Sequence, residues 1–155
     1  MTVVIDPASR DGGELDGFRI GHLPPDVGDL ASDFASEWEE VSFSTRMWER
    51  QVEDGHRVDL RVHVLRGDRL SSLAELRDFL AEYHERDPAD WALRGFQHGE
   101  EPGLIGAAEA FWLVEPGVAL DVLLDPERFT PDALRAIAVG ITAAPTDPAQ
   151  PGGAR

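Results

Sequence analysis

The chain has 155 residues, a length that fits a single domain. Its 30 acidic residues against 14 basic ones give a formal net charge of −16, and it contains no cysteine. Nucleic-acid binding needs basic side chains that displace counterions, so this charge predicts that neither DNA nor RNA is a partner. The lack of cysteine excludes disulfides, thiolate metal sites and cysteine nucleophiles.

Three regions are expected along the chain. Residues 1–16 have a linker-like composition and predict a flexible segment with, at most, a short strand at Val3–Ile5. Residues 17–143 form the single domain. Residues 144–155 contain proline and glycine but no large apolar side chain, which predicts a disordered tail.

The sequence shows neither a membrane span nor a signal peptide. No apolar run reaches about 18 residues, and Met1 is followed by neither a charged nor an apolar leader region. We therefore expect no membrane insertion and a cytoplasmic location for the chain as it stands. Export of a longer precursor stays open.

The first predicted strand of the domain is Gly17–Leu23, which ends at Pro24-Pro25 because the second proline restricts the first. The next stretch, Asp26–Ser36, is acidic and weakly patterned. We expect a loop or a short helical turn there.

Two stretches with alternating apolar residues, 41–48 and 58–64, predict a hairpin. Asp54-Gly55 lies between them and is a preferred type I′ turn pair. A two-residue loop there would place Glu53 opposite His56. The same register pairs Arg50 with Asp59, Trp48 with Arg61, Arg46 with His63, Met47 with Val62 and Thr45 with Val64.

A helix follows this hairpin. Ser72 and Glu75 form a capping box, and Asp87-Pro88 predicts the end of the helix. Its apolar stripe consists of Leu73, Leu76, Phe79, Leu80 and Tyr83.

A second hairpin is predicted from residues 111–115 and 118–124, which flank the turn pair Pro116-Gly117. Both faces are apolar, so these strands belong in the middle of a covered sheet. One face is expected to carry Phe111, Leu113, Leu120 and Val122, and the other Trp112, Val114, Ala119 and Leu123.

The last helix is predicted to begin at Thr130-Pro131, a cap followed by an N1 proline. Its stripe consists of Leu134, Ile137, Ala138 and Ile141. The order of these elements predicts an α+β fold: a single antiparallel sheet built from two hairpins, with helices packed on it.

From about Gly17 to Ala143 the chain resembles the PsbP-like fold and the uncharacterised actinobacterial proteins, often lipoproteins, thought to share it. The resemblance rests on Gly17–Ile20 leading to Pro24, on Ala110–Leu120, and on the helix Ala133–Ala138. It implies an α/β/α arrangement, with a curved sheet between helices, and an accessory or binding role. The family offers no catalytic residues to transfer, and this chain lacks the lipobox cysteine of its exported members.

The motifs of catalytic and metal sites are not found. The five histidines form no H-E-x-x-H pattern or tight metal-ligand set, and His84, at a helix end, is expected at the surface. There is no G-x-S-x-G and no phosphate-binding glycine loop. We therefore predict no catalytic residue, no metal site and no cofactor.

One constellation remains, on the face of the first hairpin that is predicted to point outward. Arginine forks suit carboxylates and phosphates, and an exposed tryptophan suits a partner. The alternative is that the N-terminal segment or a helix covers this face and that acidic neighbours such as Asp59 neutralise it. The predicted partner-binding residues are Arg46, Trp48, Arg50, Arg57, Arg61 and His63.

The function expected from the sequence is a non-catalytic binding or accessory domain for a protein or small-molecule partner. Two alternatives stay open. One is a structural component that docks an assembly through the Arg/Trp face. The other is an enzyme with a carboxylate/histidine cleft, for which no motif is present.

Overall fold

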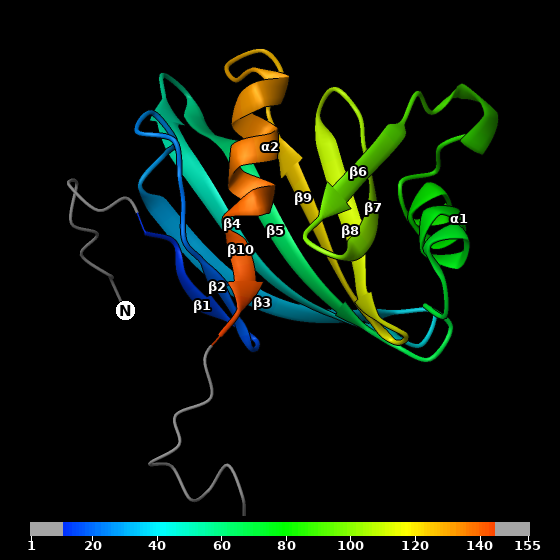
Figure 1. The fold of residues 1–155 in the computed structure, drawn as a ribbon. Helices are drawn as coiled ribbons and strands as arrows, with labels where there is room; N and C mark the ends of the chain where they lie inside the picture. Colours follow the sequence, from blue (N-terminus) through cyan, green and yellow to red (C-terminus); the bar gives the residue numbers. More distant parts are fainter. Residues whose placement is uncertain (1–10, 145–155) are drawn as a thin grey trace, which may run out of the picture.

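The computed structural model describes residues 11–144, which form two antiparallel sheets and two short α-helices (Figure 1). The large sheet has the strand order β3-β4-β5-β9-β8-β7-β6, and the small sheet has the order β1-β2-β10. The helices are α1 (Leu73–Tyr83), the 3-10 turn η1 (Pro88–Asp90) and α2 (Pro131–Val139). The strands are β1 (Gly13–Leu15), β2 (Phe18–Ile20), β3 (Leu30–Trp38), β4 (Val41–Val52), β5 (Gly55–Arg66), β6 (Arg94–His98), β7 (Glu101–Ile105), β8 (Glu109–Glu115), β9 (Val118–Leu124) and β10 (Ile141–Ala143).

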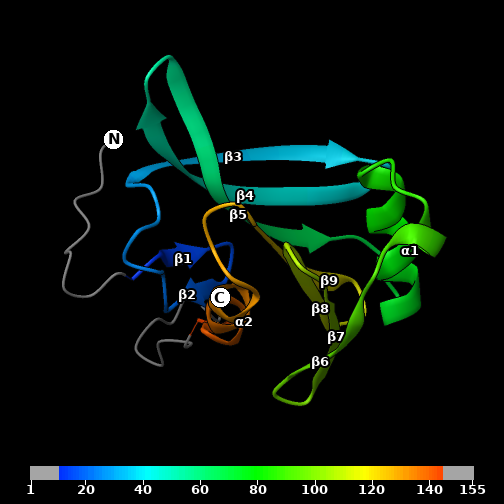
Figure 2. The ribbon, with the colours of Figure 1, turned by 90° about the horizontal axis from the view of Figure 1, so that it is seen from above.

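The large sheet curves around α2 and the small sheet, which cover its inner face (Figures 1 and 2). Helix α1 packs on part of the outer face. The predicted fold class, an α+β domain with a single sheet in a PsbP-like α/β/α arrangement, is wrong. Strands take up 49% of the described residues and helices only 17%, and a second sheet is present.

The strands that sequence patterning missed explain this difference. Strands β3, β6 and β7 lie at or next to the edges of the large sheet, and they carry glycine, proline or acidic residues in place of a regular apolar alternation. The segment Asp26–Ser36, which contains most of β3, was expected to be a loop or a short helical turn. That expectation is wrong: residues 30–38 pair with β4 along their whole length.

Two hydrophobic cores share the central strands. The inner core joins Leu134 and Ile137 of α2 to Trp48, Trp112 and the inner face of β5 and β9. The outer core joins α1 to the opposite face of the same sheet, through Leu76, Phe79, Leu80, Phe43, Leu65 and Phe111. The prediction that residues 111–115 and 118–124 lie in the middle of a covered sheet is therefore confirmed.

Both predicted helix starts are confirmed. The Ser72 side chain accepts a hydrogen bond from the Glu75 N–H, and the Thr130 side chain accepts one from the Ala133 N–H. Helix α1 ends at Tyr83, before the predicted stop at Asp87-Pro88. Glu85 has a left-handed φ of 54°, and the Arg86 N–H donates to the Ala81 carbonyl at 2.8 Å, as in a Schellman motif.

The first hairpin is confirmed as β4 and β5, but its predicted register is wrong. Val52 pairs with Gly55, so Glu53-Asp54 form the loop. The register then shifts between Trp48 and Glu49, where Asp59 is the extra residue of a β-bulge. A shift of this kind moves side chains to the opposite face relative to the prediction.

The second hairpin is also confirmed, with Pro116-Gly117 as its loop and a φ of 92° at Gly117. Here too a register shift, between Leu113 and Glu115, changes the cross-strand pairs. Phe111 therefore faces Asp121, and Trp112 faces Leu120. The predicted grouping of Phe111 with Leu120 and Val122 on one face is wrong for the same reason as in the first hairpin.

The predicted first strand is seen in shortened form as β2, which pairs with β1 and β10. Strand β1 lies inside the segment 1–16. The proposed strand Val3–Ile5 and the tail after residue 144 lie outside the described residues. Neither described helix is long and apolar enough to span a bilayer.

Candidate functional site

The predicted Arg/Trp face is not formed as one surface. Trp48 is only 1% exposed and lies in the inner core opposite Leu60. His63 is 4% exposed and faces Thr45 on the outer face of the sheet. Arg61 faces Met47 on the same outer face. The β-bulge at Asp59 is the physical cause. It shifts β5 by one residue relative to β4, so that Trp48 and Arg61, which were predicted to lie opposite each other, point to different faces of the sheet.

The remaining arginines of that set are neutralised. Arg46 donates to both carboxylate oxygens of Asp33, at 2.7 and 2.8 Å, and to the Gly12 carbonyl. Arg57 lies 3.7 Å from Asp125. These ion pairs agree with one part of the alternative, in which acidic neighbours neutralise the arginines. That the six residues bind a partner stays a prediction.

Asp59 is the centre of this neutralisation. Its side chain is fully buried and accepts hydrogen bonds from Arg50 at 3.1 Å, from Arg128 at 3.2 Å and from the Gly28 N–H at 2.9 Å. The predicted Arg50–Asp59 ion pair is thus confirmed, although the register that suggested it is wrong. The bulge moves Asp59 out of the regular ladder and leaves it within reach of Arg50.

A different cluster lies on the outer face beneath the end of α1. His84 occupies the C-cap of α1, Glu109 begins β8, and Asp121 is in the middle of β9. Because Asp121 faces Phe111 and Glu109 faces Leu123, the two carboxylates are diagonal neighbours on one face. The Schellman ending of α1 positions His84 above them.

The three side chains converge. His84 Nε2 lies 2.8 Å from Glu109 Oε2 and 3.9 Å from Asp121 Oδ2. One nitrogen or oxygen from each residue falls within 4.8 Å of the others. The exposed fractions of the side chains are 16% for His84, 5% for Glu109 and 0% for Asp121.

The cluster is electrostatically unbalanced. Within residues 11–144, Glu109 Oε1 and both carboxylate oxygens of Asp121 have no hydrogen-bond partner. Burial, reinforced by the adjacent Glu109, raises the pKa of Asp121 well above its ordinary value. Burial also acts to raise the pKa of Glu109, but that pKa is lowered overall, chiefly by the hydrogen bond between Glu109 and His84. The pair therefore needs a shared proton or a bound cation.

His63 does not supply the missing positive charge. It lies opposite Asp121 on the neighbouring strand, and its Nδ1 is 2.7 Å from Thr45 Oγ1. Burial, with a contribution from Arg61, lowers the pKa of His63 to about 4. The imidazole is therefore neutral near pH 7.

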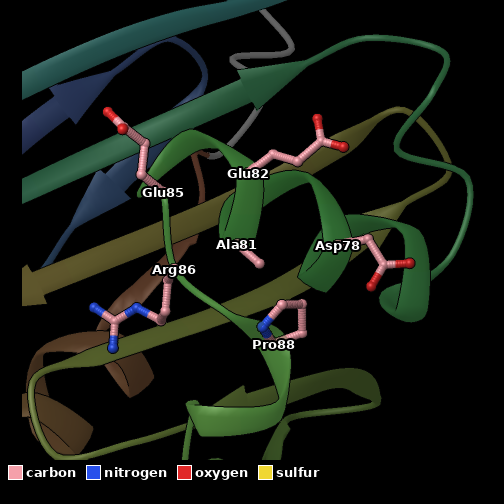
Figure 3. Close-up of a pocket in the computed structure, with 6 residues that line it drawn as sticks. All are labelled: Asp78, Ala81, Glu82, Glu85, Arg86 and Pro88. Atoms are coloured by element: carbon pink, nitrogen blue, oxygen red, sulfur yellow. The ribbon is translucent and has the colours of Figure 1, made fainter.

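A surface pocket beside α1 is less suited to a ligand. It is lined by Asp78, Ala81, Glu82, Glu85, Arg86 and Pro88. Figure 3 shows the charged ends of these side chains pointing away from one another. A binding site needs polar groups that converge, and among the described residues the His84–Glu109–Asp121 cluster, which we call the carboxylate–histidine cluster, meets this condition best.

Sequence reasoning missed this cluster. The expectation that His84 is a surface residue is wrong, since its side chain is largely buried. The three residues are distant in the sequence, and only strand register brings two of them together. One signal was available: Asp121 interrupts the otherwise apolar run Val118–Leu124. A charged residue buried in such a strand needs a partner.

No family model matches the chain, and comparisons with curated proteins and with solved structures find no similar protein. The resemblance to PsbP-like proteins thus stays a prediction.

Proposed function

We propose that this chain is a non-catalytic accessory domain that binds one divalent first-row transition-metal ion through His84, Glu109 and Asp121. The observation that carries the proposal is the convergence of three largely buried donor groups from three elements within 4.8 Å. Imidazole and carboxylate ligands together suit ions such as Zn²⁺ and Mn²⁺.

The free energy of burial supports a cation at this position. Two buried carboxylates with unpartnered oxygens destabilise the fold unless their charge is neutralised. Protonation of Asp121 is one way to achieve this, and a bound ion is another. An ion also provides partners for oxygens that, among the described residues, accept no hydrogen bond.

The burial of the cluster favours a structural ion over a catalytic one. Three protein donors leave a coordination position for a further ligand, as in catalytic sites. Asp121 is fully buried and Glu109 nearly so, which leaves a substrate little access to that position. This supports the binding or accessory role expected from the sequence over the enzyme alternative.

The test is a calorimetric titration of the chelator-treated chain with Zn²⁺ and, separately, with Mn²⁺. A thermal melt is then recorded for the metal-free chain and for the chain saturated with each ion. We expect one ion per chain. An ion present at about 100 times its Kd stabilises the fold by about 2.7 kcal/mol, which corresponds to an increase in Tm of about 5–10 °C.

Two cluster variants, His84→Gln and Glu109→Gln, should abolish both effects. His56→Gln and Glu115→Gln change the same residue types at exposed positions outside the cluster and should bind like the wild type. Equal binding by cluster and control variants, or no binding by the wild type, would refute the proposal.

A further inference from the structure

The edge strand β3 leaves one side of the large sheet open. Among the strands of residues 11–144 it pairs only with β4, and it forms the outer border of the sheet (Figure 2). Every residue from Leu30 to Glu37 is exposed, and only Trp38 is partly covered. Proteins usually protect such edges with charged side chains, proline, a bulge or a short strand. Strand β3 is nine residues long and has no proline, lysine or bulge against β4; its charged residues are Asp33 and Glu37.

The exposed side chains of β3 include large apolar ones. Leu30 is 44% exposed and Phe34 is 47% exposed. With Trp38 they share one face, because side chains of alternate residues point to the same side of a strand. This face is the outer one, where Phe34 lies opposite Thr45 and Trp38 opposite Val41.

The hairpin turn determines which backbone groups of β3 are free to pair. Glu39 and Glu40 have φ values of 51° and 67°, as a type I′ loop requires. The turn hydrogen bond then joins Trp38 and Val41, so the even-numbered residues of β3 bond to β4. The N–H and C=O groups of Ala31, Asp33, Ala35 and Glu37 therefore point away from β4.

We propose that β3 pairs antiparallel with β3 of a second copy of this chain, about a two-fold axis at Phe34. In this register Asp33 pairs with the second copy's Ala35, and Ala31 with its Glu37. All four are residues with outward-pointing backbone groups, so each pair exchanges hydrogen bonds. The large sheets of the two copies then form one continuous sheet.

The side chains favour this register over its neighbours. With the axis at Phe34, the two Phe34 rings meet, Leu30 lies opposite Trp38, and each carboxylate lies opposite an alanine. Moving the axis to Asp33 places Asp33 opposite itself, and moving it to Ala35 places Asp33 opposite Glu37. Like charges directly opposite each other destabilise a sheet, so of these three registers only the one centred on Phe34 is free of this repulsion.

The net charge of the chain predicts how dimerisation depends on salt. Two chains of charge −16 repel each other, and salt screens this repulsion. Dimerisation should therefore become tighter as the ionic strength is raised from about 0.05 to about 0.5 M. An interface held by ion pairs would weaken instead.

Sedimentation velocity of the full chain over a concentration series tests the proposal. The expected result is a reversible change from 17.0 kDa to twice that mass, with a lower dimer Kd at the higher salt. Ala35→Pro removes an outward N–H without removing a bond to β4, so the fold should persist. It should weaken the dimer by about tenfold or more. Val139→Glu changes an exposed apolar residue on α2 and serves as the control.

Disulfide cross-linking tests the proposed register of the two β3 strands. The chain contains no cysteine, so Phe34→Cys introduces a single thiol at the proposed axis. Mild oxidation should link two copies through this position much faster than through Val139→Cys. A wild-type chain that stays monomeric at both salt concentrations, a dimer unaffected by Ala35→Pro, or equal cross-linking at both positions would overturn the proposal.

Discussion

At the residue scale, Asp121 is the most unusual feature of the chain. It is a fully buried acid in a strand that otherwise carries apolar side chains, and among the described residues its two oxygens have no hydrogen-bond partner. Its raised pKa means that the metal-free fold favours the protonated acid. A group whose pKa is raised by folding stabilises the protein below its unfolded pKa, and that stability is lost as pH rises through the folded pKa.

Asp121→Asn should therefore stabilise the metal-free chain increasingly as pH rises above about 4. The asparagine amide is uncharged, as the protonated acid is, but it has no proton to lose. We expect a gain of about 1–3 kcal/mol at pH 8 relative to the wild type, measured by urea unfolding in the presence of a chelator. The exposed Asp68→Asn is the control, and its stability should parallel the wild type. A pH profile of Asp121→Asn that also parallels the wild type would contradict the prediction.

At the element scale, the conformation at the end of α1 destabilises the fold, and a substitution can remove this destabilisation. Glu85 adopts the left-handed conformation that usually belongs to glycine at this position of a Schellman motif, and its negative charge lies near the negative end of the helix dipole. Glu85→Gly should raise the free energy of unfolding by about 1 kcal/mol, which is about 2–4 °C in Tm.

Glu85→Gln separates the two causes, because it removes the charge and keeps the strained backbone. A thermal melt should show a smaller gain for glutamine than for glycine. Equal gains would mean that charge alone is responsible, and a loss of stability with glycine would show that the freedom of the unfolded chain outweighs the relieved strain.

The elements that sequence could identify are those with local chemical signals. The caps at Ser72 and Thr130 and the loop Pro116-Gly117 were predictable because each depends on neighbouring residues only. Strand β3 was not, since a strand exposed on both faces has no apolar alternation. A β-bulge shifts the strand register, but it has no sequence signal as strong as a helix cap or a turn pair. The predicted cross-strand partners of Trp48 and Phe111 were therefore wrong.

At the scale of the whole molecule, the acidic charge is combined with arginines that already have carboxylate partners. These are Arg19, Arg46, Arg50, Arg57, Arg66, Arg69 and Arg128. These ion pairs reduce the cationic surface that could release counterions from a phosphate backbone, and the net charge of −16 repels such a backbone. We expect no retardation of duplex DNA or single-stranded RNA in a mobility-shift experiment at about 0.15 M salt. Binding with a Kd below about 10⁻⁶ M, tighter than ordinary non-specific association, would contradict this.

The sequence by itself determined the strong negative charge, both helix starts and the existence of two central hairpins. Each of these follows from composition or from residues close together in the chain. Tertiary structure alone decided the second sheet, the burial of Trp48, and the meeting of His84, Glu109 and Asp121. The physical reason is that strand pairing joins distant segments, and a one-residue shift at a bulge moves side chains to the opposite face of the sheet.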